Sequence, residues 1–191
     1  MNDITPPPPA PTRPKSPGLG SRGGQKAPRR QPKSRYGVQM EEKQNLKELF
    51  GIREEQLRKY YAQARRAKEQ TGKELIALLE RRLDNAVYRA GFAPTRAAAR
   101  QLTTHRIFSV NNRPVDIPSY CLKSGDVVSV RSSKRTKALF ANFVKRMQNV
   151  HSPSWIVIDA EDFSFRVTAI PTIEEANVGV DVQAIVEFFA R

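Results

Sequence analysis

The sequence is poor in the residues from which disulfides and metal sites are built. Its 191 residues include one cysteine, Cys121, and two histidines, His105 and His151. A lone cysteine forms no intramolecular disulfide, and these three residues fall short of the ligand set of a structural zinc site. We therefore expect no metal, no other cofactor and a reducing, cytoplasmic environment.

Long hydrophobic runs are also missing. No stretch approaches the roughly 18 consecutive apolar residues that cross a bilayer. The first 17 residues are rich in proline and lack the apolar segment of a secretory signal. The sequence predicts no membrane partner, and its length suits one or two small domains.

No set of residues has the pattern of a catalytic site, which needs a nucleophile beside a base, a carboxylate pair or a metal. Cys121 has apolar neighbours and is expected to behave as a small hydrophobic residue. Asp84 fits an ion pair with a nearby helix arginine better than an acid catalyst. We expect no enzyme and no small-molecule substrate.

Acidic residues are scarce relative to basic ones. Lys and Arg number 33 and Asp and Glu 19, which gives a formal net charge of +14. Residues 1–36 carry +7, residues 37–150 carry +12, and residues 151–191 carry −5. A basic excess of this size predicts a polyanion as the partner.

Residues 1–36 contain nine of the 14 prolines and few apolar side chains. Such a segment buries too little apolar surface to offset its chain entropy, so we expect a disordered basic tail. The tail serves either as a nucleic-acid contact or as a solubilising linker. The predicted contacts are Arg29, Arg30, Lys33 and Arg35.

The apolar spacing then becomes helical. Two short helices are expected between residues 39 and 72, and a third over about 73–90. A fourth is expected over 96–104, with Thr95 as its cap and with Arg96 and Arg100 on an outward face.

After His105 the apolar period changes to two. Asn111 and Asn112 predict the turn of a β-hairpin, and 127–130 predicts a further strand. Residues 131–150 are expected to be basic and helical or irregular. Residues 155–159 and 184–189 are expected to be strands, with a capping box at 171–175 between them.

The basic residues of the middle segment gather around the third and fourth helices and the hairpin. Arginine dominates, and its planar fork suits phosphate oxygens. His105 fits either a nucleotide contact or the structural end of a helix. The basic positions are Arg81, Arg82, Arg89, Arg96, Arg100, Arg106, Arg113, Arg131, Lys134, Arg135 and Lys137.

The run from Arg82 to Phe92, followed by Thr95-Arg96 and residues 99–102, resembles the RNA-binding module of the universal uS-four family of bacterial small-subunit ribosomal proteins. Residues 117–120, 125–128 and 185–188 continue the resemblance, which covers about 35–191. Asn112 departs from it, because many members have glycine there.

The resemblance implies an α+β fold. A mainly helical first domain, 37–80 with 151–191, would be completed by C-terminal strands. An inserted alpha-L module, 81–150, would place two helices on a small antiparallel sheet and include a basic helix.

The resemblance also implies a structural constituent of the small ribosomal subunit. Such a protein binds small-subunit rRNA at a multi-helix junction, nucleates assembly and supports translational accuracy. Small-subunit ribosomal protein five and the mRNA entry path would lie nearby. The implied RNA-facing residues are Tyr36, Lys43, Lys47, Arg81, Arg82, Arg96, Arg100, His105, Arg106, Asn111 and Arg113.

Two alternatives stay open at this point. One is an RNA-modifying enzyme that carries the same module, although the remaining residues are few for a catalytic domain. The other is a stand-alone RNA-binding protein for ribosome rescue or regulation, for which the segment 39–72 would have no purpose.

Overall fold

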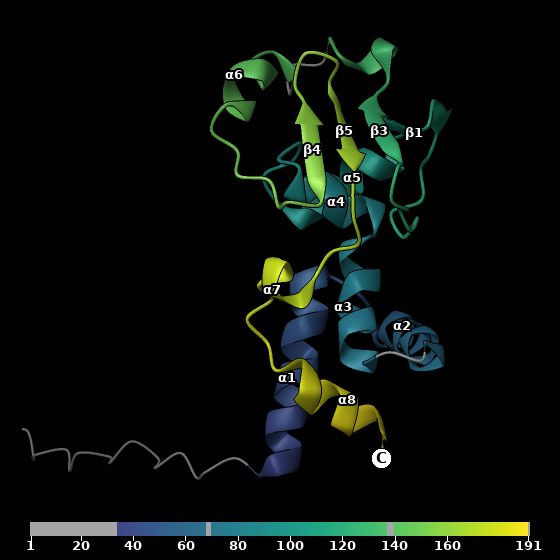
Figure 1. Cartoon of the computed structure of the whole chain (residues 1–191), viewed down its shortest axis with the longest axis vertical. Helices are drawn as coiled ribbons and strands as arrows, with labels where there is room; N and C mark the ends of the chain where they lie inside the picture. Colours follow the sequence, from purple (N-terminus) through teal and green to yellow (C-terminus); the bar gives the residue numbers. More distant parts are fainter. Residues whose placement is uncertain (1–33, 68–69, 137–139, 191) are drawn as a thin grey trace, which may run out of the picture. The chain divides into compact units, whose positions relative to one another are not determined.

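A computed structural model of the chain describes residues 34–67, 70–136 and 140–190 (Figure 1). The predicted tail contacts Arg29, Arg30 and Lys33, together with Lys137, lie outside the described residues. In chain order the elements are α1 (Arg35–Phe50), α2 (Glu54–Arg66), α3 (Thr71–Glu80), α4 (Leu83–Arg89), α5 (Arg96–Thr104), β1 (Phe108–Val110), β2 (Arg113–Pro114), β3 (Val127–Val130), the 3-10 helix η1 (Ser132–Lys134), α6 (Phe143–Met147), β4 (Ile156–Asp159), β5 (Ser164–Val167), α7 (Ile173–Ala176) and α8 (Val182–Ala190).

The two helices expected before residue 72 are α1 and α2. The hydroxyl of Ser34 caps α1 by accepting a hydrogen bond from the Gly37 amide at 3.2 Å. Gly51 ends α1 with a φ of 59°, a left-handed conformation that costs glycine little. Leu57 and Ala64 are the buried side of α2.

The single helix expected over 73–90 is wrong, because the chain breaks between α3 and α4. Arg82 forms an isolated antiparallel bridge with Cys121. The Leu83 amide donates to the Tyr120 carbonyl and the Leu122 amide to the Arg81 carbonyl, both at 2.8 Å. This pairing with a distant segment extends the backbone, and local periodicity carries no sign of it.

The fourth helix and the hairpin are confirmed. The Thr95 hydroxyl caps α5 by accepting from the Ala98 amide at 3.1 Å. Asn111 and Asn112 have φ values of 48° and 64° and connect β1 to β2. Asparagine tolerates this left-handed region, so the turn forms without glycine.

The strands form one antiparallel sheet in the order β2-β1-β3-β5-β4 (Figure 1). The predicted α+β class is confirmed. The strands after residue 150 nevertheless extend the sheet that begins with the hairpin, and they do not complete the helical part as expected. Val128 lies opposite Phe165, and both are fully or almost fully buried, so the inner faces of β3 and β5 match.

The strand expected over 184–189 is wrong, because these residues belong to α8. Ile185 is fully buried and packs in the same hydrophobic cluster as Leu46 of α1. Phe189 stacks on Tyr61 with the ring centroids 4.8 Å apart. A short apolar run fits a strand and a buried helix equally well, and its packing partners decide between them. The capping box from Thr172 to Glu175 is confirmed at the start of α7.

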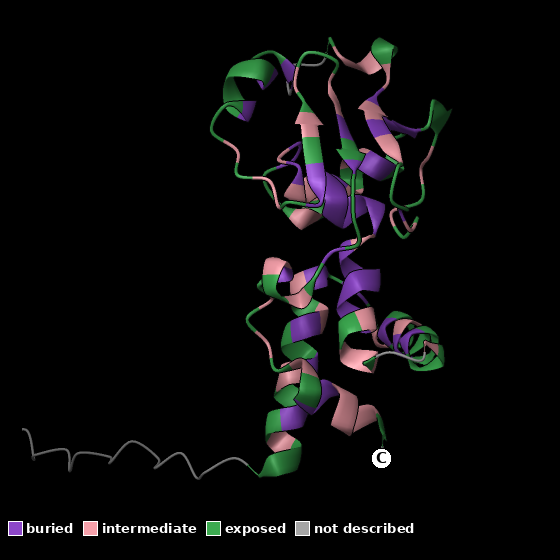
Figure 2. Cartoon of the chain, in the orientation of Figure 1, coloured by how far each residue is buried: buried purple, intermediate pink, exposed green. Residues whose placement is uncertain are grey.

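Two hydrophobic clusters hold the described residues together (Figure 2). One lies between α4, α5, α6 and the sheet and includes Phe92, Phe108 and Trp155. The other lies among α1, α2, α3, α7 and α8 and includes Leu46, Leu79 and Ile185. In the part of the chain that the structure describes, no helix is both long and apolar enough to span a bilayer.

Candidate nucleic-acid interface

Two buried carboxylates organise the arginines around α4. Glu80, at the end of α3, is fully buried, and Asp84, in the first turn of α4, is 3% exposed. A buried carboxylate is costly unless it is paired and hydrogen-bonded. Arginines from α4, α5 and the chain just before α4 supply these partners.

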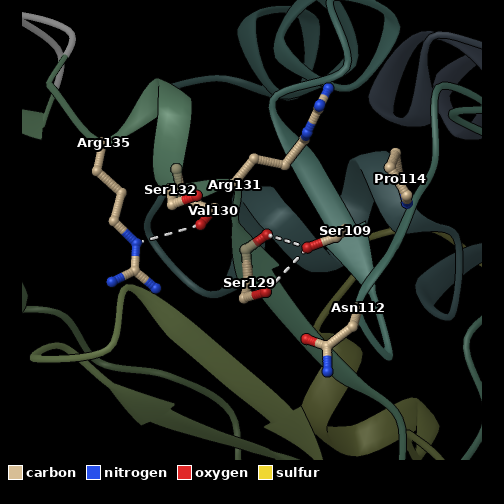
Figure 3. Close-up of a pocket in the computed structure, with 8 residues that line it drawn as sticks. All are labelled: Ser109, Asn112, Pro114, Ser129, Val130, Arg131, Ser132 and Arg135. Atoms are coloured by element: carbon tan, nitrogen blue, oxygen red, sulfur yellow. Dashed lines mark hydrogen bonds between the residues drawn. The ribbon is translucent and has the colours of Figure 1, made fainter.

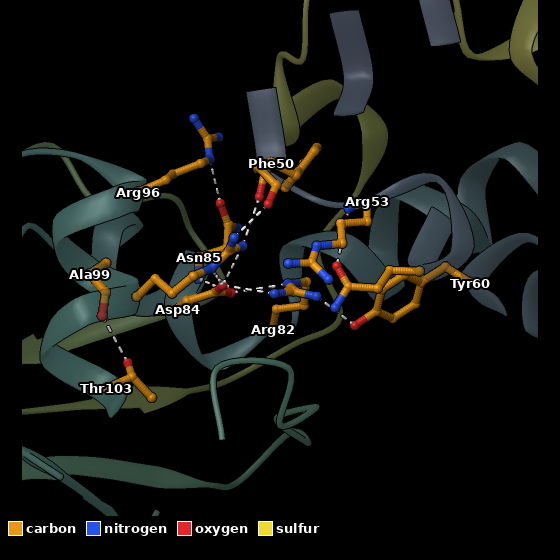
Figure 4. A network of polar contacts seen from close by, with 12 residues as sticks. Phe50, Arg53, Tyr60, Arg82, Asp84, Asn85, Arg96, Ala99 and Thr103 are labelled. Atoms are coloured by element: carbon orange, nitrogen blue, oxygen red, sulfur yellow. Dashed lines mark hydrogen bonds and ion pairs between the residues drawn. The ribbon is translucent and has the colours of Figure 1, made fainter. Parts of the chain in front are cut away.

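Arg82 lies in the interior beside Asp84 (Figure 4). Its Nε donates to Oδ1 of Asp84 at 3.0 Å, its Nη2 to Oδ2 at 2.8 Å, and its Nη1 to the Tyr60 hydroxyl at 2.8 Å. Burial opposes the charged form, but Asp84 and Tyr60 outweigh it and raise the pKa of Arg82 above its ordinary value. Because its side chain is only 3% exposed, Arg82 does not face RNA as expected.

Arg100 joins α5 to the end of α1. Its Nε donates to Oδ2 of Asp84 at 2.9 Å, and its Nη2 donates to the Phe50 carbonyl at 2.9 Å. Its Nη1 donates to the Gly51 carbonyl. The expectation that this side chain points outward was wrong, because the helix end of α1 supplies acceptors that the sequence of α5 cannot reveal.

Glu80 holds a second group of polar side chains. Nη2 of Arg89 donates to Oε1 of Glu80 at 2.7 Å and to the Ala176 carbonyl, so α4 is tied to α7. Nδ2 of Asn85 donates to Oε2 of Glu80 at 2.7 Å. In turn, Nε of Arg96 donates to Oδ1 of Asn85 at 2.8 Å (Figure 4).

Arg96 is held by rings as well as by Asn85. Its guanidinium carbon lies 4.6 Å from the Tyr88 ring centroid and 5.1 Å from that of Phe50. Burial, together with the nearby charge of Arg89, lowers the pKa of Arg96. Arg96 and Arg100 were both expected to face outward, but both are half-buried.

The predicted contacts on α1 are mostly engaged with acids. Lys43 is 8% exposed, and its Nζ lies 3.1 Å from Oε1 of Glu54. Lys47 pairs with the other oxygen of Glu54 at 3.2 Å. Arg35 pairs with Glu187 at 2.7 Å and lowers the pKa of that carboxyl.

Tyr36 and Arg81 differ from these lysines. Tyr36 is 51% exposed, and its ring centroid lies 5.6 Å from that of Phe188, so one side of the ring faces solvent. Arg81 is half-buried and donates from Nε to the Leu122 carbonyl at 2.8 Å. Among the described residues, neither side chain forms a hydrogen bond or an ion pair with a residue of the hairpin.

The residues around the hairpin turn are exposed, but two of them have local partners. The amide of His105 donates to the Gln101 carbonyl at 3.0 Å and ends α5, while the ring lies at the surface. Arg106 pairs with Asp116 at 2.7 Å. Asn111 donates from Nδ2 to Asp126 and accepts from the Val127 amide, so its side chain closes the turn.

The remaining basic residues have no acidic partner among the described residues. Arg131 donates to the Arg106 carbonyl at 3.3 Å. Arg135 donates to the Val130 carbonyl at 3.3 Å and to the Asp162 carbonyl at 2.7 Å. Hydrogen bonds to backbone carbonyls orient the guanidinium groups of Arg131 and Arg135 without neutralising their charge. We call the set the basic hairpin surface, and it consists of Arg113, Arg131, Lys134 and Arg135.

The sequence did not reveal Glu80 and Asn85 as the partners that hold Arg89 and Arg96, because the acceptors are buried and their spacing is irregular.

Burial raises the pKa of the Cys121 thiol, which keeps it protonated and a poor nucleophile. Within residues 34–67, 70–136 and 140–190, no three His, Cys, Asp or Glu side chains are grouped as a metal would require.

Two family models match the chain. The first is described as the ribosomal protein S4/S9 N-terminal domain and matches residues 15–80. The second is described as the S4 domain and matches residues 81–128, from the break between α3 and α4 to the start of β3. The first match ends at Glu80 and the second begins at the next residue.

Several curated proteins are similar over most of the chain. The small ribosomal subunit protein uS4 of Chloroflexus aurantiacus is 46% identical over 167 residues, which is 86% of this chain and 81% of that protein. The proteins of the same name from Herpetosiphon aurantiacus and Persephonella marina are each 44% identical. These two alignments cover 85% and 82% of this chain, and 78% and 77% of the respective relatives.

Proposed function

Because the chain belongs to the uS4 family of small ribosomal subunit proteins, we propose that it binds small-subunit rRNA directly at a junction of several RNA helices. Family membership makes it a component of the small subunit of the cytoplasmic ribosome and not an enzyme. The proposal concerns which side chains contact the RNA and what the contact achieves.

The observation that carries the proposal is the lack of acidic partners at the basic hairpin surface. Arg113 and Lys134 form no hydrogen bond or ion pair through their side chains with any described residue, and the hydrogen bonds that Arg131 and Arg135 donate go only to carbonyls. Unneutralised guanidinium groups have N–H donors left for phosphate oxygens. We propose this surface as the main phosphate contact.

The other predicted residues take different places in the proposal. His105, Arg106 and Tyr36 are exposed and would lie at the margin of the RNA contact. Arg81, Arg96 and Arg100 are half-buried, so they would contact RNA only through the edges of their guanidinium groups. Arg29, Arg30, Lys33 and Arg35 would add contacts from the N-terminal segment.

The buried network would act as a positioning device. Arg100 fixes α5 against the end of α1, and Arg89 fixes α4 against the carbonyl of Ala176. RNA recognition of this kind depends on shape and on contacts to phosphates and 2′-hydroxyls more than on base edges. A rigid arrangement of basic groups would therefore select one geometry of the junction and nucleate assembly around it.

The proposal extends to the surroundings in the ribosome. Asp159, Glu161 and Asp162 are exposed and belong to the acidic part of the chain after residue 150. Opposite charge favours a basic protein neighbour there, and we propose small-subunit ribosomal protein five in this place. The mRNA entry path would lie nearby, and support of translational accuracy would follow from holding this region rigid.

The test is a filter-binding comparison of the full chain with an rRNA fragment that contains the junction and with a plain RNA duplex of equal length. If about 6 to 10 phosphates are neutralised, affinity for the junction should fall by roughly 10³ to 10⁵ between 50 and 200 mM salt. Tighter binding to the junction than to the duplex is expected. Equal affinity for both, or a flat salt response, would contradict the proposal.

A further inference from the structure

A pocket of about 310 Å³ lies on the face of the sheet that the helices leave open (Figure 3). Its volume is at the small end of the range of ligand sites, roughly 300 to 1,000 Å³. The side chains that define it come from β1, the hairpin turn, β2, β3 and the chain that follows β3. They include Ser109, Asn112, Pro114, Ser129, Ser132 and Arg135.

The floor of the pocket is a pair of serine hydroxyls. Ser109 and Ser129 lie opposite each other on β1 and β3, and their Oγ atoms are 3.0 Å apart. Because side chains alternate along a strand, both serines point away from the core that contains Phe108, Val128 and Val130. Each hydroxyl has hydrogen-bonding capacity left for a ligand.

Arg135 forms the cationic wall. Two carbonyls hold its guanidinium, that of Val130 at 3.3 Å and that of Asp162 at 2.7 Å. The Phe163 ring supports it from 5.3 Å. Only two of its five N–H donors are used in these bonds. The side chain is therefore oriented in advance and still able to bind an anion.

None of the described residues that line the pocket is acidic, and Arg131 adds a second positive charge at its edge. The Asn112 amide and the Ser132 hydroxyl line it too, and neither side chain has a hydrogen-bond partner among the described residues. The pocket thus combines cationic groups with neutral donors and acceptors, and its lining, as far as the structure describes it, offers no aromatic side chain on which a base could stack.

We propose that this pocket binds one ribose-phosphate unit of an RNA strand that crosses the open face of the sheet. Arg135 would contact the phosphate, and the Ser109–Ser129 pair would contact the ribose 2′-hydroxyl. The inference rests on the proposed function and specifies how one part of the basic hairpin surface, around Arg135, binds RNA. Without a stacking platform, the pocket would recognise the RNA backbone and not the base.

RNA suits the pocket better than an acidic segment of protein. Protein partners are usually anchored by aromatic or large apolar side chains in complementary pockets. Within the described part of the lining, Pro114 and Val130 are the apolar residues, and Val130 is 1% exposed. The serine hydroxyls both donate and accept hydrogen bonds, which matches a sugar hydroxyl that also does both, whereas an ionised carboxylate only accepts.

The test uses Ser129→Leu in the full chain, which fills the floor without changing the charge. Ser164→Leu is the matched control, because Ser164 lies opposite Ser129 on β5 and does not line the pocket. With the rRNA junction fragment as the probe, we expect Ser129→Leu to weaken binding about tenfold or more, which is about 1.4 kcal/mol. Ser164→Leu is expected to stay within about twofold of the unchanged protein.

A second comparison tests the sugar contact itself. In the RNA fragment, the 2′-hydroxyls are replaced by hydrogen at the nucleotides that the bound chain protects. This should weaken binding to the unchanged protein and have little effect on the affinity of Ser129→Leu. Arg135→Gln, which keeps most of the side-chain volume, should lower the salt slope by about 1. It also provides an answer if Ser129→Leu does not fold, as judged by its thermal melt.

The outcomes separate the two proposals. If the unchanged chain does not prefer the junction, the proposed function fails. If it does, but Ser129→Leu and Arg135→Gln bind like the unchanged chain, the pocket inference is overturned. A signal change from a fluorophore attached at residue 112 that polyglutamate causes and RNA does not would overturn the inference in favour of a protein partner.

Discussion

Arg100 and Asp84 lie on successive helices and meet through a 2.9 Å hydrogen bond from Nε to Oδ2. The same guanidinium also reaches the carbonyls of Phe50 and Gly51 at the end of α1. One side chain therefore satisfies a buried carboxylate and two helix-terminal carbonyls at once. Because these three acceptors belong to two separate parts of the chain, α4 and the end of α1, loss of the Arg100 side chain should affect the structure beyond α5.

Asp84→Asn is expected to be strongly destabilising. The substitution leaves the guanidinium of Arg82 buried without a counter-charge, and breaking such a pair costs about 3–5 kcal/mol. Asp116→Asn is the control, because Asp116 pairs with Arg106 at the surface, where such pairs contribute about 0–1 kcal/mol. Urea denaturation followed by circular dichroism measures both. If both variants lost a similar free energy of unfolding, the buried Arg82–Asp84 pair would contribute no more to stability than the surface pair.

Arg100→Ala should lower the free energy of unfolding by about 1–3 kcal/mol, since three acceptors lose a donor. Arg100→Lys should recover part of this loss at most, because one ammonium cannot span acceptors that the planar guanidinium reaches together. Hydrogen exchange locates the effect. Faster exchange of the Ile52 amide, which closes the end of α1, is expected in Arg100→Ala, whereas exchange faster only within α5 would contradict the link to α1.

Gly91→Ala should be more damaging than Gly125→Ala. Both glycines have left-handed backbones, with φ of 74° and 93°, where a side chain costs about 1–2 kcal/mol. A Cβ at Gly91 would also lie 2.7 Å from Cγ1 of Val150, whereas a Cβ at Gly125 would meet nothing within 4 Å. Overpacking adds about 1–3 kcal/mol at Gly91. Thermal melts of the two variants compare these costs directly, and equal melting temperatures would contradict the close contact.

Glu54 should make stability depend on acid pH. Burial disfavours its charged form, but the hydrogen bonds and charges of Lys43 and Lys47 outweigh this and hold its pKa below the usual 4.5. A lowered carboxyl pKa stabilises the fold above the usual value, and this contribution is lost as the pH falls through the folded-state value.

The measurement for Glu54 is the melting temperature between about pH 6 and pH 3 for the unchanged chain and for Glu54→Gln. The glutamine variant is expected to be less stable at neutral pH and to lose less stability on acidification. Glu55→Gln is the control, since Glu55 is an exposed neighbour on the same turn of α2. Parallel pH profiles for Glu54→Gln and the unchanged chain would contradict the lysine pairing.

Local signals in the sequence predicted local structure well. Thr95 and the apolar spacing after it predicted α5, and two asparagines predicted a hairpin turn whose φ values are positive, as expected. The capping box beginning at Thr172 was also correct. Each of these features depends on residues within a few positions of one another, which is the range that propensity and capping chemistry cover.

Features that depend on distant partners were missed. Arg81 and Arg82 leave the helix because they pair with the segment around Cys121, and α8 is helical because it packs against α1. The candidate site shows the same limit. The sequence predicted where arginines gather, but only the structure distinguishes Arg82 and Arg100, whose charge is satisfied internally, from Arg131 and Arg135, whose charge is available.

The packing of α1 against α8 has a consequence for synthesis of the chain. Leu46 is made early, whereas Ile185, which shares its hydrophobic cluster, is made about 140 residues later. At a synthesis rate of roughly 5 to 20 residues per second, many seconds pass between the synthesis of α1 and that of α8, which packs against it. The cluster around Phe92 contains no residue after Val167 and can close earlier. A nascent chain should therefore fold its middle first and its beginning last.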